Sequence, residues 1–269
     1  MRCKIIAEVG WSHIGDMNLA KEMIDAAVEC GADFVKFQTW SVSNLVSGEW
    51  DNDGRREIYE KAELSKDDHQ LLFDYVKSKG ANFLTSVFNH KDLWKLPEEY
   101  SDYIKIPSTE ITNSALLEAV YEKFDHLIIS TGASTFEEVV DATWDHLDGS
   151  TLMHCVSAYP CSPSSACLNR IRRLQKFSGS VGYSDHTTGI AAPAFAISCG
   201  CEFVEKHFTT DPSLPGRDNK FAATPDILRS ICQIRDDLSV MTECSSDEIQ
   251  EVERGARDYR GRWGGEQNG

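Results

Sequence analysis

The chain has 269 residues, 41% of them hydrophobic and 26% charged, a composition that excludes global disorder and allows a large buried core. Its formal net charge of -16 repels phosphate backbones and anionic lipid headgroups, so we expect no nucleic-acid or membrane partner. The nine cysteines are scattered without a paired CxxC motif and the N-terminus lacks a signal-peptide pattern, which together favour reduced thiols in a cytoplasmic protein.

In chain order, short β-rich apolar segments alternate with segments whose apolar residues recur at helical spacing. The expected strands are 4–10, 33–38, 82–88, 103–108, 126–131, 150–156, 179–184 and 202–208. The expected helices are 17–32, 65–80, 90–97, 112–123, 134–147, 166–176, 188–199 and 225–240. A long polar insertion, 41–62, follows the second strand. Capping boxes are expected at Ser65 with Asp68 and at Ser134 with Glu137.

Eight strand–helix alternations indicate a parallel sheet, and at this chain length they predict an α/β fold, the (β/α)₈ TIM barrel, over residues 1–245. A doubly wound open sheet is the alternative, but the glycine-rich phosphate turn typical of that fold is missing after the first strand. Residues 246–269 are polar and aperiodic, and we expect a flexible C-terminal tail there.

Two lysines lie within apolar strands, Lys36 in "DFVKFQ" and Lys105 in "YIKIP". Each points either into the barrel or toward the helices, and a buried cation is costly without a partner. Two structural explanations need no ligand. The aliphatic part of each lysine could be buried while its ammonium reaches the barrel rim, or the ammonium could form an ion pair with Glu8 or Glu110. A bound phosphate or carboxylate is favoured, and serines at the strand ends would complete its hydrogen bonds: Ser108, Ser130 and Ser184.

Two histidines end consecutive units, His186 in "GYSDHT" and His207 in "EKHFT". Neutral imidazoles on adjacent strands can bind one divalent cation and leave positions open for substrate and water. The acids beside them, Asp185 and Glu205, would orient the imidazoles or bind the metal directly. Either histidine alone would be better explained by a hydrogen bond to the backbone. Three other histidines are expected on the solvated surface: His69, His126 and His146.

Seven motifs occur in one order along the chain: "IIAEVGWSHIGD", "GADFVKFQTW", "YIKIPSTE", "LIISTGAST", "LMHCVSAYPCSP", "VGYSDHTTGI" and "VEKHFTTDPSLPGRD". With these motifs the chain resembles the catalytic barrel of the sialic acid synthase family, from about residue 3 to residue 240. The resemblance implies that phosphoenolpyruvate condenses with an open-chain N-acetylated amino sugar, such as N-acetylmannosamine or its 6-phosphate. A divalent cation, manganese or magnesium, would polarise the aldehyde.

The resemblance also implies residue roles. His186 and His207 match the metal ligands of the family. The phosphoenolpyruvate contacts match Lys36, Lys105, Ser108, Ser130 and Ser184, with Ser157 in place of a family asparagine. The residues that face the sugar match Glu8, Gln38, Tyr159 and Asp218. Glu205 matches an acid that moves a proton or positions water, and Glu8 is the second acid–base candidate.

Bacterial and animal members of that family usually continue into an antifreeze-like domain that reaches into the partner subunit, and no such segment follows Gly269 in this sequence. The expected partners are therefore a second copy of the chain, as a homodimer, or a separate antifreeze-like protein. Two other functions stay open: a related barrel synthase acting on a different aldose phosphate, and a non-catalytic sugar-phosphate-binding subunit.

Overall fold

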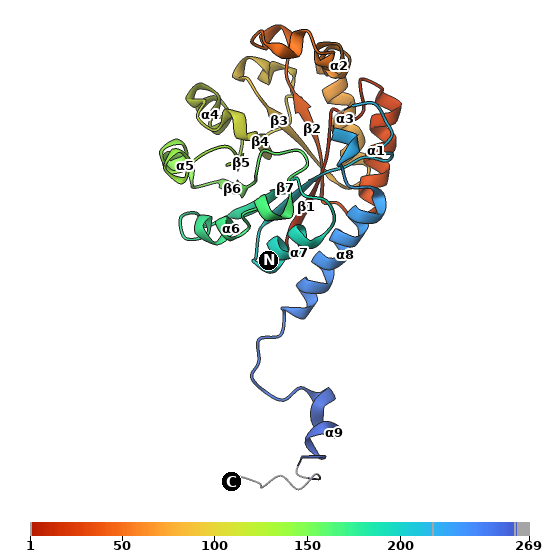
Figure 1. Ribbon diagram of the computed structural model, residues 1–269, viewed down its shortest axis with the longest axis vertical. Helices are drawn as coiled ribbons and strands as arrows, with labels where there is room; N and C mark the ends of the chain where they lie inside the picture. The colour runs from red at the N-terminus through yellow and green to blue at the C-terminus, as the bar shows by residue number, and fades with distance from the viewer. Residues whose placement is uncertain (1, 217, 261, 263–269) are drawn as a thin grey trace.

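The computed structural model describes residues 2–216, 218–260 and 262, and at its centre eight parallel strands close into a barrel in chain order (Figure 1). The strands are β1 Lys4–Gly10, β2 Phe34–Thr39, β3 Asn82–Val87, β4 Tyr103–Ile106, β5 His126–Ser130, β6 Ser150–His154, β7 Val181–Asp185 and β8 Phe203–His207. The last strand pairs with the first, Lys4 beside Phe203, so the barrel has no free edge. The predicted TIM barrel is confirmed, and the open-sheet alternative is wrong.

Helices surround the barrel (Figure 1). Their bounds are α1 Met17–Glu29, α2 Arg55–Ala62, α3 Lys66–Ser78, α4 Ser114–Tyr121, α5 Phe136–Thr143, α6 Asn169–Leu174, α7 Ala191–Ser198, α8 Pro225–Met241 and α9 Arg254–Arg257. The predicted helix at 90–97 is instead a 3₁₀ helix, His90–Lys95. The insertion is not irregular throughout, because its second half forms α2.

The two predicted capping boxes have different outcomes. The box at the start of α3 is confirmed, since the Asp68 carboxylate accepts from the Ser65 backbone N–H and the Ser65 hydroxyl accepts from the Asp68 N–H. The box before α5 was placed one residue too early, and Thr135 with Glu138 forms it. Ala133 adopts a left-handed φ of 55°, and this turn delays the helix start in a way that the residue pattern does not reveal.

The barrel interior is apolar at one level and polar at the next. Its apolar floor consists of Ile6, Phe34, Leu84, Ile128, Met153 and Phe203. Alternate residues of a strand share a face, so the residue two positions beyond each floor residue also points inward. On β2 this places Lys36 above Phe34, and on β8 it places Glu205 above Phe203. The sequence left open whether the two lysines point into the barrel or toward the helices. Lys36 and Lys105 both point into the barrel, where they are buried.

His69 lies in the core between α3 and the barrel, so the expectation that it is solvated was wrong. It is fully buried, and its Nε2 lies 2.8 Å from the Thr39 hydroxyl while its Nδ1 lies 2.7 Å from the Ser65 carbonyl oxygen. Burial lowers the pKa of His69 to about 4. The buried positions of α3 are His69, Leu72, Phe73 and Val76, which is helical periodicity that the sequence already contains.

Beyond α8 the chain runs away from the barrel to the short helix α9 (Figure 1). The tail predicted at 246–269 includes 261 and 263–269, which lie outside the described residues. None of the helices in the described part of the chain has the length and apolar character that crossing a membrane requires.

Arg235 ties the last long helix to the start of the barrel. Its side chain is 1% exposed, and its guanidinium lies 2.6 Å from Asp33 Oδ2 and 3.1 Å from the Gly31 carbonyl oxygen. The same Asp33 oxygen accepts from the Ile5 backbone N–H at 2.7 Å. An ion pair between buried Arg235 and half-buried Asp33 therefore joins α8 to the first two strands.

We expect Arg235→Ala to lower the free energy of unfolding by about 2–3 kcal/mol, because the Gly31 carbonyl and Asp33 lose their buried cation while Asp33 keeps its contact with Arg2. Urea denaturation measures this change. Arg229→Ala is the matched control on the same helix, because its partner Asp226 is solvent-exposed, and it should change stability by about 0.5 kcal/mol or less. Equal effects of the two substitutions would contradict the role given to Arg235.

Candidate active site

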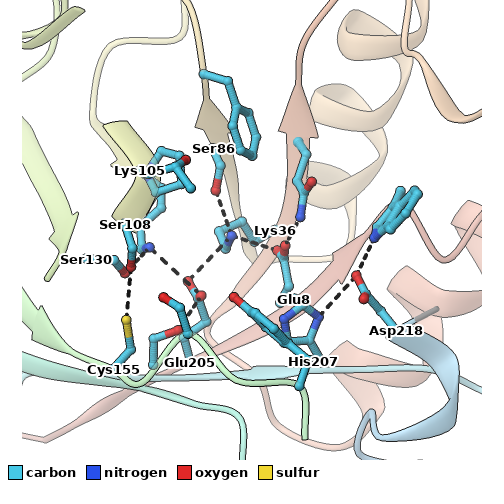
Figure 2. Close-up of a pocket in the computed structure, with 18 of the residues that line it drawn as sticks. Glu8, Lys36, Ser86, Lys105, Ser108, Ser130, Cys155, Glu205, His207 and Asp218 are labelled. Atoms are coloured by element: carbon cyan, nitrogen blue, oxygen red, sulfur yellow. Dashed lines mark hydrogen bonds and ion pairs between the residues drawn. The ribbon is translucent and has the colours of Figure 1, made fainter. Parts of the chain in front are cut away.

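A cavity of about 320 Å³ opens at the carboxyl ends of the strands, and of the residues expected at the site all but Asp185 line it. Figure 2 shows part of this lining, including Glu8, Lys36 and Glu205. The expected residues in the lining are Glu8, Lys36, Gln38, Lys105, Ser108, Ser130, Ser157, Tyr159, Ser184, His186, Glu205, His207 and Asp218. They come from seven of the eight strands or the loops that follow them, which is how a barrel assembles a site from residues far apart in sequence. Their individual roles remain predictions.

Lys36 is buried at the bottom of the cavity, one layer above the apolar floor of the barrel. Its Nζ lies 2.8 Å from Glu8 Oε2 and 3.6 Å from Glu205 Oε2, and it donates to the Ser86 hydroxyl at 2.8 Å. Register explains the contact with Glu8, because β1 and β2 pair Glu8 directly with Lys36. Gln38, two residues further along β2, donates to Glu8 Oε1 at 2.7 Å. The amide passes close to Gly10, where a Cβ would lie 3.1 Å from the Gln38 nitrogen.

The pKa values of the two acids beside Lys36 are shifted in opposite directions. Burial raises the pKa of Glu8, the charge of Lys36 only partly offsets this, and the charge of Glu205 adds to the rise. Burial also acts to raise the pKa of Glu205, but Lys105 and Lys36 outweigh it and lower that pKa to about 2. One acid is thus disposed to hold a proton and the other to stay ionised, the pattern of an acid–base pair.

Lys105 is the less compensated of the two cations. Its Nζ donates to the Ser130 hydroxyl at 2.5 Å, and the nearest carboxylate oxygen, on Glu205, is 4.0 Å away. Burial lowers the pKa of Lys105, and the charge of Glu205 offsets only part of that shift. An anion bound beside this ammonium would supply the negative charge that Lys105 lacks as a partner. This part of the cavity therefore favours an anionic ligand.

Small polar groups surround the space beside Lys105. The Ser108 hydroxyl accepts from the Gly132 N–H at 3.1 Å and lies 3.0 Å from the Cys155 sulfur. A Cβ on Gly132 would lie 2.5 to 2.8 Å from Ser157 Oγ, Cys155 Sγ and Ser108 Oγ. Glycine is therefore required there to keep these three groups around one small space.

His186 and His207 lie side by side, with ring centroids 5.5 Å apart. His186 Nδ1 is 2.7 Å from the Val156 carbonyl oxygen, which requires a proton on Nδ1 and leaves the Nε2 lone pair free. Burial and the neighbouring His207 lower the pKa of His186 to about 4. His186 is therefore neutral at pH 7, the form that binds metals.

The chemistry of this pair suits a divalent cation that keeps positions open for substrate. Within the described ranges, no three His, Cys, Asp or Glu side chains converge as a metal site. The protein would thus supply two imidazoles, and substrate or water the remaining ligands. Asp218 Oδ2 lies 3.8 Å from His207 Nδ1 (Figure 2), and Tyr159 packs on His186 with centroids 4.2 Å apart.

Asp185 does not belong to this group, so its expected role beside the histidines is wrong. Its carboxylate lies 2.5 Å from Lys206 Nζ and accepts from the Tyr183 hydroxyl and the Thr187 N–H. Strand alternation is the reason: Ser184 and Glu205 point into the barrel, and the next residues, Asp185 and Lys206, point toward the helices. Of the two acids, only Glu205 lines the cavity.

Sequence reasoning missed the aromatic side of the cavity. It consists of Trp11, Trp40, Tyr59 and Phe88, with Leu45, Arg55 and Pro107 beside them. Most come from the insertion and from loops, where no periodic signal marks residues that fold back over a site. Ser86, at the end of β3, also lines the cavity, and its pairing with Lys105 follows from the barrel register.

The sequence profile of the NeuB family matches residues 23–245. The N,N'-diacetyllegionaminic acid synthase of Legionella pneumophila is 38% identical over 262 residues, covering 90% of this chain and 74% of that protein. The pseudaminic acid synthase of Helicobacter pylori is 35% identical over 236 residues, covering 81% and 69% of the two chains. The crystal structure of the N-acetylneuraminic acid synthetase of Leptospira borgpetersenii superposes with a TM-score of 0.84 at 31% identity, covering 97% of this chain and 92% of that one.

We expect Gly132→Ala to weaken binding of a phosphate- or carboxylate-bearing anion by about tenfold or more, because the new methyl group displaces the Ser108 and Ser157 hydroxyls; phosphoenolpyruvate is the probe. Isothermal titration calorimetry measures the affinity. Gly179→Ala is the control, since a Cβ there meets nothing within 4 Å and should leave binding unchanged. Unaltered affinity in Gly132→Ala would show that the ligand does not use this space.

Proposed function

The chain belongs to the NeuB family, and on that premise we propose that it condenses phosphoenolpyruvate with an open-chain N-acetylated amino sugar to form a nonulosonic acid. The relatives reported above are named as synthases of such acids. One observation carries the proposal: two buried lysines and two neighbouring imidazoles line one cavity, so that an anion site adjoins a site for a divalent cation.

In this reaction the methylene carbon of phosphoenolpyruvate attacks the aldehyde carbon, and the aldehyde oxygen becomes a hydroxyl after taking up a proton. Water adds to the carbon that bears the phosphate, the carbon–oxygen bond to phosphate breaks, and inorganic phosphate leaves. Lys105 and Lys36 would hold the anionic substrate, and Ser108, Ser130 and Ser184 would donate hydrogen bonds to it.

The two acids would divide the proton transfers between them. Glu8, whose pKa is raised by burial, would donate a proton to the developing alkoxide. Glu205 stays ionised beside both lysines, and it would orient the attacking water and keep the ammonium groups in place. Gln38 is bonded to Glu8 and would direct that carboxyl group toward the sugar.

His186 and His207 would hold a manganese or magnesium ion, which when bound acts as a Lewis acid on the aldehyde oxygen. Val156 fixes the His186 tautomer, so its Nε2 is available as a ligand. Tyr159 and Asp218 lie against these imidazoles and would contact the sugar.

Phosphate release from phosphoenolpyruvate, with manganese supplied and a panel of aldehydes, tests the proposal. The panel contains N-acetylmannosamine, its 6-phosphate, a 2,4-diacetamido hexose and simple aldose phosphates. Turnover with an N-acetylated sugar supports it, and turnover confined to aldose phosphates favours the related barrel synthases instead. No turnover with any sugar, alone or with an added antifreeze-like protein, would favour a non-catalytic binding subunit.

Sedimentation of the purified chain tests the proposed homodimer.

We expect Lys105→Ala to raise the KM for phosphoenolpyruvate by about tenfold or more and to change the KM for the sugar much less, because it removes a charged partner of the anion. Steady-state kinetics with each substrate varied in turn gives both constants. Lys66→Ala removes an exposed lysine and serves as the control. Equal rises in both constants would point to general damage.

We expect His207→Ala to abolish metal-dependent turnover and to weaken binding of Mn²⁺, because one of the two protein ligands is lost. Electron paramagnetic resonance of free Mn²⁺ measures binding, and circular dichroism checks that the barrel stays folded. His90→Ala, at an exposed position, should retain both properties. Full activity in His207→Ala would refute the role of this side chain.

A further inference from the structure

Trp11 follows β1 and lies at the boundary between the predicted sugar-binding residues and the insertion. It is 9% exposed and lines the cavity. Its indole N–H donates a hydrogen bond to Asp218 Oδ2, the same oxygen that lies 3.8 Å from His207 Nδ1. Trp11 therefore contacts a predicted sugar-facing residue rather than the anion site.

The hydrogen bond constrains how Asp218 presents its carboxylate. An indole nitrogen is a donor only, so it selects one oxygen of the carboxylate. The side chain of Asp218 is 12% exposed, and its second oxygen has no hydrogen-bond donor within the described part of the chain. With one oxygen held by Trp11 near His207, the other is available to a hydroxyl or amide of a ligand in the cavity.

Trp11 is in turn held by the insertion. Its ring stacks on Tyr59 of α2, with centroids 4.9 Å apart and an interplanar angle of 10°. Tyr59 makes edge-to-face contacts with Trp40 and Trp50, at 6.0 and 5.6 Å. These contacts combine a large buried area with a defined ring geometry, which favours one orientation of the indole.

Polar contacts hold the chain at both ends of the insertion, a buried one at Ser41 and a half-buried one at Glu63, the residue that follows it. At one end the Ser41 hydroxyl donates to Asp92 Oδ1 at 2.5 Å. At the other, Lys95 Nζ lies 2.7 Å from Glu63 Oε1. The loop after Trp11 also packs tightly against α2, because a Cβ on Gly15 would lie 2.0 Å from the Lys61 carbonyl oxygen. The first loop and the insertion therefore form one fixed unit.

We propose that Trp11 is a positioning residue for the sugar substrate: it holds the Asp218 carboxylate beside His207, and the insertion sets its orientation through Tyr59. The inference rests on the proposed function, because it assigns a role at the sugar end of that site. It gives the 41–62 insertion a part in sugar recognition, although of its residues only Leu45, Arg55 and Tyr59 line the cavity.

The first test is Trp11→Phe, which keeps an aromatic ring on Tyr59 and removes the N–H. We expect the KM for the sugar to rise by about tenfold, as for a lost hydrogen bond to a charged group, while the KM for phosphoenolpyruvate changes by about twofold or less. Trp94→Phe, at a tryptophan that is 64% exposed, is the control and should change neither constant. A proportionate rise of both constants in Trp11→Phe, or no change, would overturn the proposal.

A double-mutant cycle tests whether Trp11 acts through Asp218. In an Asp218→Ala background, Trp11→Phe should produce about twofold or less further change in the sugar KM, because the acceptor is already gone. Additive effects of the two substitutions would mean that Trp11 acts by another route, and would overturn the proposal.

A second measurement does not depend on turnover or on the folding of Trp11→Phe. In spectra of ¹⁵N-indole-labelled protein, Asp218→Ala should shift the Trp11 Nε1–H resonance upfield and leave that of Trp94 in place. Tyr59→Leu should shift the Trp11 resonance as well, because the stacked ring is lost. A Trp11 resonance that ignores Asp218→Ala refutes the inference even if the enzyme is active. A shifted resonance in a chain that turns over no sugar would leave the contact standing while the proposed function fails.

Discussion

The ion pairs of Lys36 with Glu8 and Glu205 are the contact on which the rest of the site depends. A cation and two carboxyl groups above an apolar floor are costly to bury, and the arrangement is tolerable because Lys36 Nζ lies within 3.6 Å of both carboxyl groups. The positive charge of Lys105 is only partly compensated by Glu205, and burial lowers the pKa of this lysine. The protein thus keeps a partly uncompensated cation at the place where an anionic substrate would bind.

The same charges shift the pKa values of the two acids in opposite directions. Lys105 and Lys36 keep Glu205 ionised, and the ionised Glu205 helps to raise the pKa of Glu8. The protonation of each acid depends on the charge of the other acid and of the two lysines, so the four groups titrate as one coupled cluster. A bound anion next to Lys105 would alter that balance, so in the proposed reaction substrate binding would change the pKa values of both acids.

The cavity has two sides of different chemistry. On one side lysines, serines and the glycine at 132 surround a small space suited to a phosphate or carboxylate. On the other, imidazoles and Asp218 face an aromatic cluster to which the loops after β1, β2 and β3 and the insertion contribute. Barrel strands carry the first side and loops carry much of the second. Substrate choice can therefore vary through the loops while the anion site stays with the barrel.

Periodicity in the sequence was sufficient to identify eight strands, the barrel and the residues at the strand ends, because burial imposes repeats of 2 and 3.6 residues on any strand–helix alternation. The side toward which each strand residue points needed the folded chain. Lys36 and Asp185 show this, since the pattern permits either face and closure of the barrel selects one. Residues outside the barrel strands, such as Trp11, Tyr59 and Asp218, come together through contacts between segments far apart in sequence. No local pattern records such contacts, which is why the aromatic side of the site emerged only from the three-dimensional arrangement.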